Sequence, residues 1–180
     1  MNIKGKRLFV DLTFFSPKGN ILDISNDNTG IIYNITKHNN DLVDIDDCKL
    51  SDEMIYDNCA VFFVCSMVSK LELENMFNDI NKSLKENGEI YIWDRVKEKG
   101  EIVRDDIYAL LPNKITKNFK YTNLNPFVEF KLDNIEKILE KNFDIAETII
   151  WDKIMYLKLK KKGTNKDENI ISRDKLEIYT

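Results

Sequence analysis

The chain has 180 residues, of which 43% are hydrophobic and 32% are charged, and its formal net charge at pH 7 is −4. This length fits one domain with a single core, and the composition is that of a globular protein rather than a disordered or membrane-spanning one. The slight acidic excess provides no field that would attract nucleic acid or an anionic membrane surface, so neither is expected as a partner.

The cysteines and the histidine argue against a disulfide framework and against a metal site. Cys48, Cys59 and Cys65 form no CxxC pair, their number is odd, and His38 is the single histidine. The N-terminal segment has no signal-peptide pattern, and no apolar run approaches the roughly 20 residues that a membrane helix needs. We therefore expect a reduced, cytoplasmic protein.

Apolar runs predict three elements in the first quarter of the chain. Residues 20–25, NILDIS, follow a turn signal and predict a first buried strand. Residues 30–38 space their isoleucines as one face of a short helix, although the adjacent β-branched pair would suit a strand nearly as well. Residues 41–46, DLVDID, alternate as in a strand.

The next segment has the pattern of a crossover unit in a parallel sheet. Residues 60–68, AVFFVCSMV, are apolar without alternation, as in a central strand that is buried on both faces. Residues 71–84 place their apolar side chains largely on one helical face, and Gly88 is expected at the end of this helix. Residues 89–93, EIYIW, alternate as a further strand that Asp94 ends.

The last part of the chain predicts an irregular insert, a helix and a hairpin. Residues 99–130 show no clear period, whereas residues 132–141 are amphipathic, with Asp133 as a candidate N-cap. Residues 143–150 and 153–159 are strand patterns so close in sequence that they should pair antiparallel.

These elements predict an α/β fold, a three-layer sandwich around a Rossmann-like, mostly parallel sheet with one reversed strand at its edge. Residues 1–162 would form a single domain, with residues 99–130 as an insert between the fifth strand and the last helix. Residues 163–180 are polar and charged and read as a tail.

Four features together resemble one known family. They are the run PKGNILDI with its strand-terminal Asp23, and Asp46 at 23 positions further on. The third is the block at residues 54–94 with its ending LKENGEIYIWD, and the fourth is the final helix and hairpin. Over residues 18–162 the chain resembles class I S-adenosylmethionine-dependent methyltransferases of the small-molecule type.

The resemblance implies that S-adenosylmethionine is the cofactor and that a small molecule is the substrate. The cofactor would lie at the carboxyl ends of the first, second and fourth strands, with residues 25–30 at its methionine moiety and Asp46 at its ribose. Candidate cofactor-binding residues at these strand ends are Asp23, Ser25, Asp27, Thr29, Gly30, Asp46, Asp47 and Cys65.

The chain departs from the family pattern in the turn after the first strand. The family has three alternate glycines there, which allow positive φ and close approach of the backbone to the cofactor. Here Ser25, Asp27 and Thr29 occupy these places, and Gly30 comes one step late. A carboxylate at residue 27 adds bulk and negative charge where the carboxylate of the cofactor would lie.

The middle of the domain is also shorter than in the family, which leaves two alignments open. In the first, residues 30–38 are a helix, residues 41–46 are the second strand, and the third strand is missing. In the second, residues 30–36 are the second strand, residues 41–50 are the third, and Asp47 or Cys48 would lie near the adenine. The first is preferred because the spacing from Asp23 is met without gaps.

The sequence identifies no catalytic residue and leaves two functions open. Methyl transfer requires mainly alignment of the acceptor with the methyl group, so an enzyme need not display a conspicuous base. Asp46 serves either as a ribose ligand or as the acid that ends a strand, and Cys65 is favoured as a core residue. The chain is therefore a methyltransferase acting on a small molecule, or an inactive methyltransferase-fold protein with a binding, regulatory or structural role. Its oligomeric state is not encoded in any motif.

Overall fold

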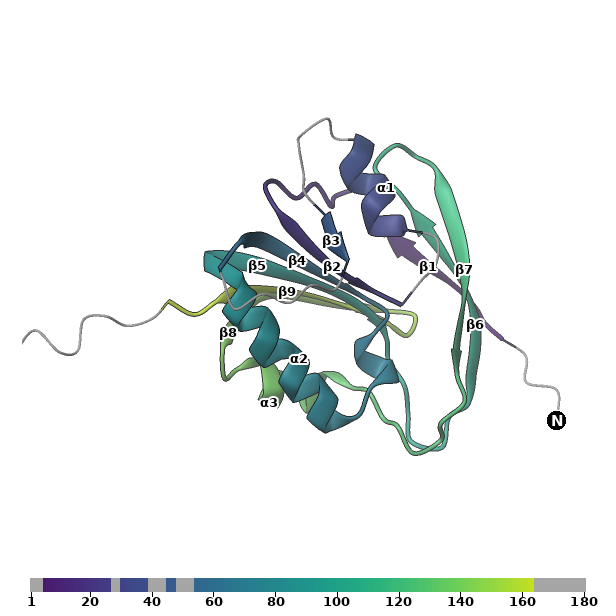
Figure 1. The fold of residues 1–180 in the computed structure, drawn as a ribbon. Helices are drawn as coiled ribbons and strands as arrows, with labels where there is room; N and C mark the ends of the chain where they lie inside the picture. The colour runs from purple at the N-terminus through teal and green to yellow at the C-terminus, as the bar shows by residue number, and fades with distance from the viewer. Residues whose placement is uncertain (1–4, 27–29, 39–44, 48–53, 164–180) are drawn as a thin grey trace, which may run out of the picture.

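The computed structural model describes residues 5–26, 30–38, 45–47 and 54–163, which form a mixed α/β fold with two sheets (Figure 1). The larger sheet has six strands in the order β3-β2-β4-β5-β9-β8, and the smaller sheet has the order β1-β6-β7. The larger sheet consists of β3 (Ile45–Asp47), β2 (Ile21–Ser25), β4 (Tyr56–Phe62), β5 (Leu84–Arg95), β9 (Ile154–Lys161) and β8 (Phe143–Trp151). The smaller consists of β1 (Arg7–Asp11), β6 (Val103–Leu110) and β7 (Thr116–Asn123).

The strand directions confirm the mixed α/β class and correct the position of the reversed strand. β3, β2, β4 and β5 run parallel to one another, whereas β9 is antiparallel to both β5 and β8. The reversed strand thus lies one position inside the edge, between β5 and β8, and not at the edge itself. Parallel strands buried between two layers carry near-continuous apolar runs, and six of the seven residues of β4 are buried.

The helices of the described residues are α1 (Ile31–His38), the 3₁₀ turn η1 (Cys65–Met67), α2 (Lys70–Ser83) and α3 (Leu132–Leu139). The expected helix at residues 30–38 is thus confirmed, and the alternative of a strand there is wrong. The expected strand at residues 60–68 lies earlier, because β4 ends at Phe62 and the chain then turns into η1.

α2 forms where the apolar period predicts it, and it begins with a capping box. The backbone amide of Glu72 donates to Ser69 Oγ at 3.4 Å, and the amide of Ser69 donates to Glu72 Oε2 at 2.8 Å, so two N–H groups at the helix start are satisfied. Gly88 does not end this helix as expected. α2 ends at Ser83, and Asn87, with a φ of 63°, supplies the left-handed turn within β5.

The last helix and the hairpin lie where the sequence predicts them, with local corrections. The N-cap of α3 is Lys131, without a side-chain cap, and Asp133 lies in the first turn instead. There its carboxylate still interacts favourably with the helix dipole. The β8–β9 turn consists of Asp152 and Lys153, which both have positive φ, one residue later than expected.

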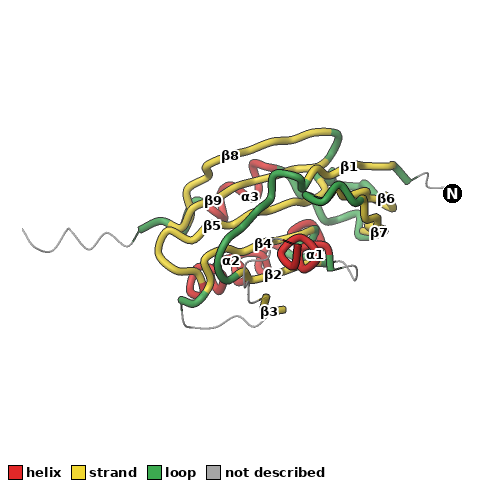
Figure 2. The backbone as a smooth tube through the Cα atoms, turned by 90° about the horizontal axis from the view of Figure 1, so that it is seen from above, coloured by secondary structure: helices red, strands yellow, loops and turns green. Residues whose placement is uncertain are grey.

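The two faces of the larger sheet are covered differently (Figure 2). On one face α2 and α3 bury the apolar core that includes Leu22, Val61 and Ile92. On the other face α1 and the smaller sheet bury a second core, which includes Phe62 and Trp93. The outer layer on this second side is therefore largely a sheet and not a layer of helices.

The smaller sheet corrects the expectation of an irregular insert. Residues 103–123 fold into the antiparallel β6–β7 hairpin, and β1, which the sequence did not predict as a strand, pairs parallel with β6. Segments from the start and the middle of the chain thus join in one sheet. Within the described residues, no helix has both the length and the apolar character needed to cross a membrane.

Candidate functional site

The carboxyl ends of the parallel strands β3, β2 and β4 lie side by side at one end of the larger sheet, and this is where ligands bind in open α/β folds. Asp23 is the third of the five residues of β2, so it does not end the strand as expected. It is 5% exposed, and its carboxylate accepts a hydrogen bond from the Ser25 hydroxyl. Just beyond β2, the backbone amide of Asn26 donates to the carbonyl oxygen of Phe62 at 3.0 Å. This bond ties the start of the β2–α1 turn to the end of β4.

Gly30 supplies the left-handed backbone that starts α1. Its φ is 60°, and its carbonyl oxygen accepts from the backbone amide of Asn34 at 2.9 Å and from the Asn34 side chain at 2.7 Å. The turn thus has one glycine at positive φ, immediately before the helix. The two other predicted residues of the turn, Asp27 and Thr29, lie outside the described residues.

Replacing Gly30 by alanine is expected to lower the free energy of unfolding by about 1–2 kcal/mol, because an alanine pays the steric cost of left-handed backbone. Space is not the obstacle, since an added Cβ would lie 3.7 Å from its nearest neighbour, the Cβ of Tyr33. Urea denaturation measures the loss. Gly163→Ala is the matched control, because Gly163 has open space and no positive φ, and an equal loss in both variants would contradict the prediction.

The backbone register relates the two acids of β3 to Asp23. Asp47 is the partner of Asp23, whereas Asp46 is the partner of Leu22. Both acids therefore lie at the carboxyl end of β3, as expected, and Asp47 is the one that is level with Asp23.

Cys65 lies at the same edge but belongs to the apolar core on the α2–α3 side. Burial, and next the nearby Asp94 carboxylate, raises the pKa of the Cys65 thiol well above its usual range, so the thiol stays protonated and is a poor nucleophile. Cys65 also lines a cavity of about 310 Å³ between α2 and α3, whose walls include Leu73, Phe130 and Ile138.

Ser66, next to Cys65, is held by a buried polar network that joins three elements. Its backbone amide donates to Asp94 Oδ2 at 3.0 Å, and its hydroxyl donates to Asp94 Oδ1. The Ser66 Oγ also lies 2.7 Å from the hydroxyl oxygen of Tyr121, and the Asn123 side chain donates to the Ser66 carbonyl oxygen at 2.7 Å. Every polar atom of Ser66 is thus engaged, so β5 and the β6–β7 hairpin together fix the turn that follows β4.

Burial sets the charge state within this network. It raises the pKa of Asp94 to about 6, because the hydrogen bonds from Ser66 and the neighbouring amides only partly offset the cost of desolvating the carboxylate. The same burial, and next the Asp94 carboxylate, raises the pKa of Tyr121, so its hydroxyl remains protonated.

A buried ion cluster lies next to the network. Arg95 is 1% exposed, and its guanidinium pairs with Asp105 of β6 at 2.9 Å and with Glu101 at 2.7 Å. Nearby, the Lys97 ammonium donates to the carbonyl oxygens of Asn125 and Val128, each at 2.7 Å. These contacts attach the whole segment after β5 to the end of that strand.

Comparison of the sequence with protein-family models finds no match, and comparison with curated proteins finds none either. Comparison of the structure finds similar folds. One is the PH0226 protein of Pyrococcus horikoshii OT3, 13% identical, with 83% of this chain and 84% of that chain covered and a TM-score of 0.51.

Two further similar structures are named for their chemistry. A Burkholderia thailandensis 1,6-didemethyltoxoflavin-N1-methyltransferase, with bound 1,6-didemethyltoxoflavin and S-adenosylhomocysteine, is 11% identical, with 80% of this chain and 71% of that chain covered and a TM-score of 0.51. An S-adenosylmethionine-dependent methyltransferase from Clostridium acetobutylicum ATCC 824 is also 11% identical, with 81% and 85% covered and a TM-score of 0.51. The chain has the S-adenosylmethionine-dependent methyltransferase fold.

The methyltransferase fold accounts for the element order in the first of the two alignments. β2, α1 and β3 correspond to its first strand, first helix and second strand, and β4, α2 and β5 form the predicted block at residues 54–94. The missing third strand of that alignment stays a prediction, because residues 48–53, between β3 and β4, lie outside the described residues. Among the described strands, β3 is the edge strand on this side of the sheet.

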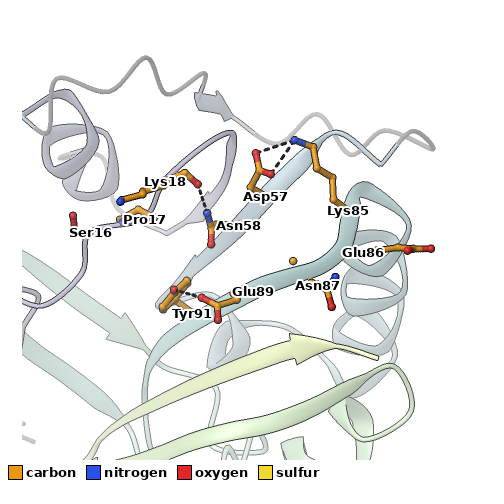
Figure 3. A pocket seen from close by; sticks show the side chains of 11 residues that line it. Ser16, Pro17, Lys18, Asp57, Asn58, Lys85, Glu86, Asn87, Glu89 and Tyr91 are labelled. Carbon is orange, nitrogen blue, oxygen red and sulfur yellow. Dashed lines mark hydrogen bonds and ion pairs between the residues drawn. The ribbon is translucent and has the colours of Figure 1, made fainter. Parts of the chain in front are cut away.

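A cavity of about 400 Å³ lies at the opposite end of the sheet, away from the crevice of a methyltransferase fold (Figure 3). The Lys85 ammonium binds both carboxylate oxygens of Asp57 at 2.9 Å there, and the Asn58 side chain donates to the Lys18 carbonyl oxygen at 2.6 Å. Because this cavity lies where β4 begins, we do not assign it to the cofactor.

The sequence did not predict the Ser66 network, although Asp94 was expected at the end of a strand. The four side chains come from η1, β5 and β7, and 28 to 57 positions separate the bonded partners. Only the expected position of the neighbouring Cys65 at a strand end pointed to this region.

Proposed function

We propose that this protein is an S-adenosylmethionine-dependent methyltransferase that acts on a small molecule. The observation that carries the proposal is that the carboxyl ends of β3, β2 and β4 lie side by side, with Asp23 within β2 and the left-handed Gly30 opening α1. The fold similarity to a methyltransferase solved with S-adenosylhomocysteine and a small-molecule substrate supports it.

The residues at this edge fit the parts of the cofactor by their chemistry. Residues 25–30 would face the methionine moiety, where backbone amides at the start of α1 favour a carboxylate. An acid at the end of β3 would accept hydrogen bonds from the ribose hydroxyls. S-adenosylmethionine supplies a methyl group on a sulfonium, so the chain needs mainly to hold the acceptor in line with it.

A second candidate is a methyltransferase-fold module without catalysis, used in binding, regulation or assembly. The packing of aromatic side chains just after the end of β4 favours this second candidate. The rings of Phe63 and Phe119 lie 5.2 Å apart and those of Phe63 and Tyr121 5.7 Å apart, so aromatic side chains of the hairpin pack onto the sheet. The replaced glycines in the β2–α1 turn favour the same alternative.

Calorimetric titration with S-adenosylhomocysteine distinguishes the two candidates. The methyltransferase proposal expects saturable binding and a rise in melting temperature, because a ligand at a hundred times its Kd stabilises the folded state by about 2.7 kcal/mol. Adenosine and methionine, titrated separately, are the controls for partial occupancy. If millimolar S-adenosylhomocysteine produced neither heat nor a shift in melting temperature, only the non-catalytic module would remain as a candidate.

Asp46→Asn and Asp47→Asn form a matched pair that tests the ribose contact. Successive residues of a strand lie on opposite faces, so only one of the two substitutions should weaken binding. We expect it to be Asp47→Asn, in register with Asp23, with a loss of about 1.5–3 kcal/mol, roughly a 10- to 150-fold rise in Kd. Asp46→Asn should bind as the unmodified protein does. A loss confined to Asp46→Asn, or equal losses in both, would contradict the assignment.

A further inference from the structure

β8 forms one edge of the larger sheet, and it is long. It has nine residues, whereas β3 at the other edge has three. Within the described residues, β8 pairs with β9 alone, so its other side presents backbone N–H and C=O groups. A long edge strand of this kind is a template for pairing with another strand.

Apolar side chains on both faces extend this edge into a larger surface. Ile149 and Ile150 are 42% and 50% exposed and lie on opposite faces of β8, since their cross-strand partners Tyr156 and Met155 belong to different cores. An exposed pair of this kind next to unpaired backbone is characteristic of an interaction surface.

Two exposed aromatic residues continue the surface on the side of Ile149. The ring of Phe14 packs edge-to-face on Tyr156, with 5.4 Å between centroids, and Tyr156 is the cross-strand partner of Ile149. The Trp151 indole donates to the Phe9 carbonyl oxygen at 2.8 Å, which brings the exposed Phe9 beside the end of β8. We call Phe9, Phe14, Ile149 and Ile150, together with the free side of β8, the β8 edge surface.

The charges along β8 favour a second copy of the chain in antiparallel orientation. The strand carries Asp144 and Glu147, and the turn after its last residue, Trp151, holds Asp152 and Lys153. Parallel pairing of two copies would place like charges side by side, which destabilises a sheet. Antiparallel pairing about a two-fold axis separates these acids and brings Asp144 of each copy toward the Asp152–Lys153 turn of the other. Asp144 then exchanges its 3.8 Å contact with Lys162, and Lys153 its 3.8 Å contact with Glu98, for a contact across the interface.

We propose that two copies of this chain associate through the β8 edge surface, with β8 of one copy antiparallel to β8 of its partner. The two larger sheets then form one continuous sheet, and the isoleucines on both of its faces become buried. Such an interface is isologous, as in most homodimers, because each copy contributes the same strand and the same side chains. β2 and β3, whose carboxyl ends form part of the candidate cofactor site, lie on the opposite side of the larger sheet from β8. The interface therefore leaves that site free.

Sedimentation velocity of the full chain, from about 1 µM to about 100 µM, tests the proposal by mass action. The unmodified protein should show a species of twice the mass of one chain that grows with concentration. Ile150→Lys should remain monomeric over the same range, because it places a charge in the interface while its side chain in the monomer is half exposed. Leu71→Lys, at an exposed position of α2, is the matched control and should dimerise normally.

Charge exchange tests the orientation. Asp144→Lys and Lys153→Asp should each raise the dimer dissociation constant several-fold, and the double variant should restore it. Circular dichroism and melting curves establish that every variant is folded. A monomer at all concentrations for the unmodified protein, or a dimer unaffected by Ile150→Lys, would overturn the proposal. Dimerisation with no recovery in the double variant would overturn the antiparallel arrangement.

Discussion

Replacing Arg95 by methionine should lower the free energy of unfolding by about 3–5 kcal/mol, because it leaves a buried carboxylate without its partner. Arg95 and Asp105 are 1% and 4% exposed, and their atoms lie 2.9 Å apart. Asp105 keeps one hydrogen bond, from the Lys6 backbone amide at 2.8 Å, which does not neutralise its charge. Glu101 is 27% exposed and regains water more readily.

Urea denaturation measures this loss, and Lys85→Met is the matched control. The Lys85–Asp57 pair is equally short, at 2.9 Å, but its side chains are 43% and 38% exposed, so breaking it should cost no more than about 1 kcal/mol. The double variant Arg95→Met/Asp105→Asn should recover part of the loss by removing the unpaired charge. Equal losses in Arg95→Met and Lys85→Met would show that burial does not govern the cluster.

The same ion pair explains why the smaller sheet was not predicted from the sequence. In β6 the inward positions alternate correctly, yet one of them is Asp105, so the run VRDDIYAL lacks an apolar period. The partner that makes an inward aspartate tolerable, Arg95, lies on another strand, and a single sequence does not show this pairing. By contrast, α2 has its full signal within one contiguous segment and was predicted as a helix. β4 was predicted too late in the chain, because the apolar run continues beyond Phe62 into η1.

The candidate site was predictable to the same extent. The position of Asp23 in the first strand of the parallel sheet and the parallel order follow from local patterns and the family resemblance, and they locate the carboxyl ends of the strands. The strand itself continues two residues beyond Asp23, to Ser25. The choice between Asp46 and Asp47 depends on register, which is set by pairing across strands and not by either strand alone. The Ser66 network depends on Tyr121 and Asn123 of β7, and this strand was itself not predicted.

Asp94 makes the contribution of the Ser66 network to the free energy of unfolding depend on pH, and Asp94→Asn should remove this dependence. The pKa of this carboxyl is about 6 in the folded protein and 3.8 as its ordinary value. Below pH 3.8 the group is protonated in both states and its contribution to stability is fully present. As the pH rises toward 6, the unfolded state releases its proton first, so this contribution is lost. Integrated over the shift, the loss is about 3 kcal/mol.

The measurable quantity is the difference in unfolding free energy between Asp94→Asn and the unmodified protein, obtained by urea denaturation at several pH values. Contributions of the other titrating groups cancel in this difference. Asparagine can still accept from the Ser66 amide while carrying no charge, so the difference should shift toward the variant by about 3 kcal/mol between acidic and neutral pH. A difference that stays constant with pH would mean that the Asp94 carboxylate is not desolvated, and that the turn after β4 is held without a buried charge.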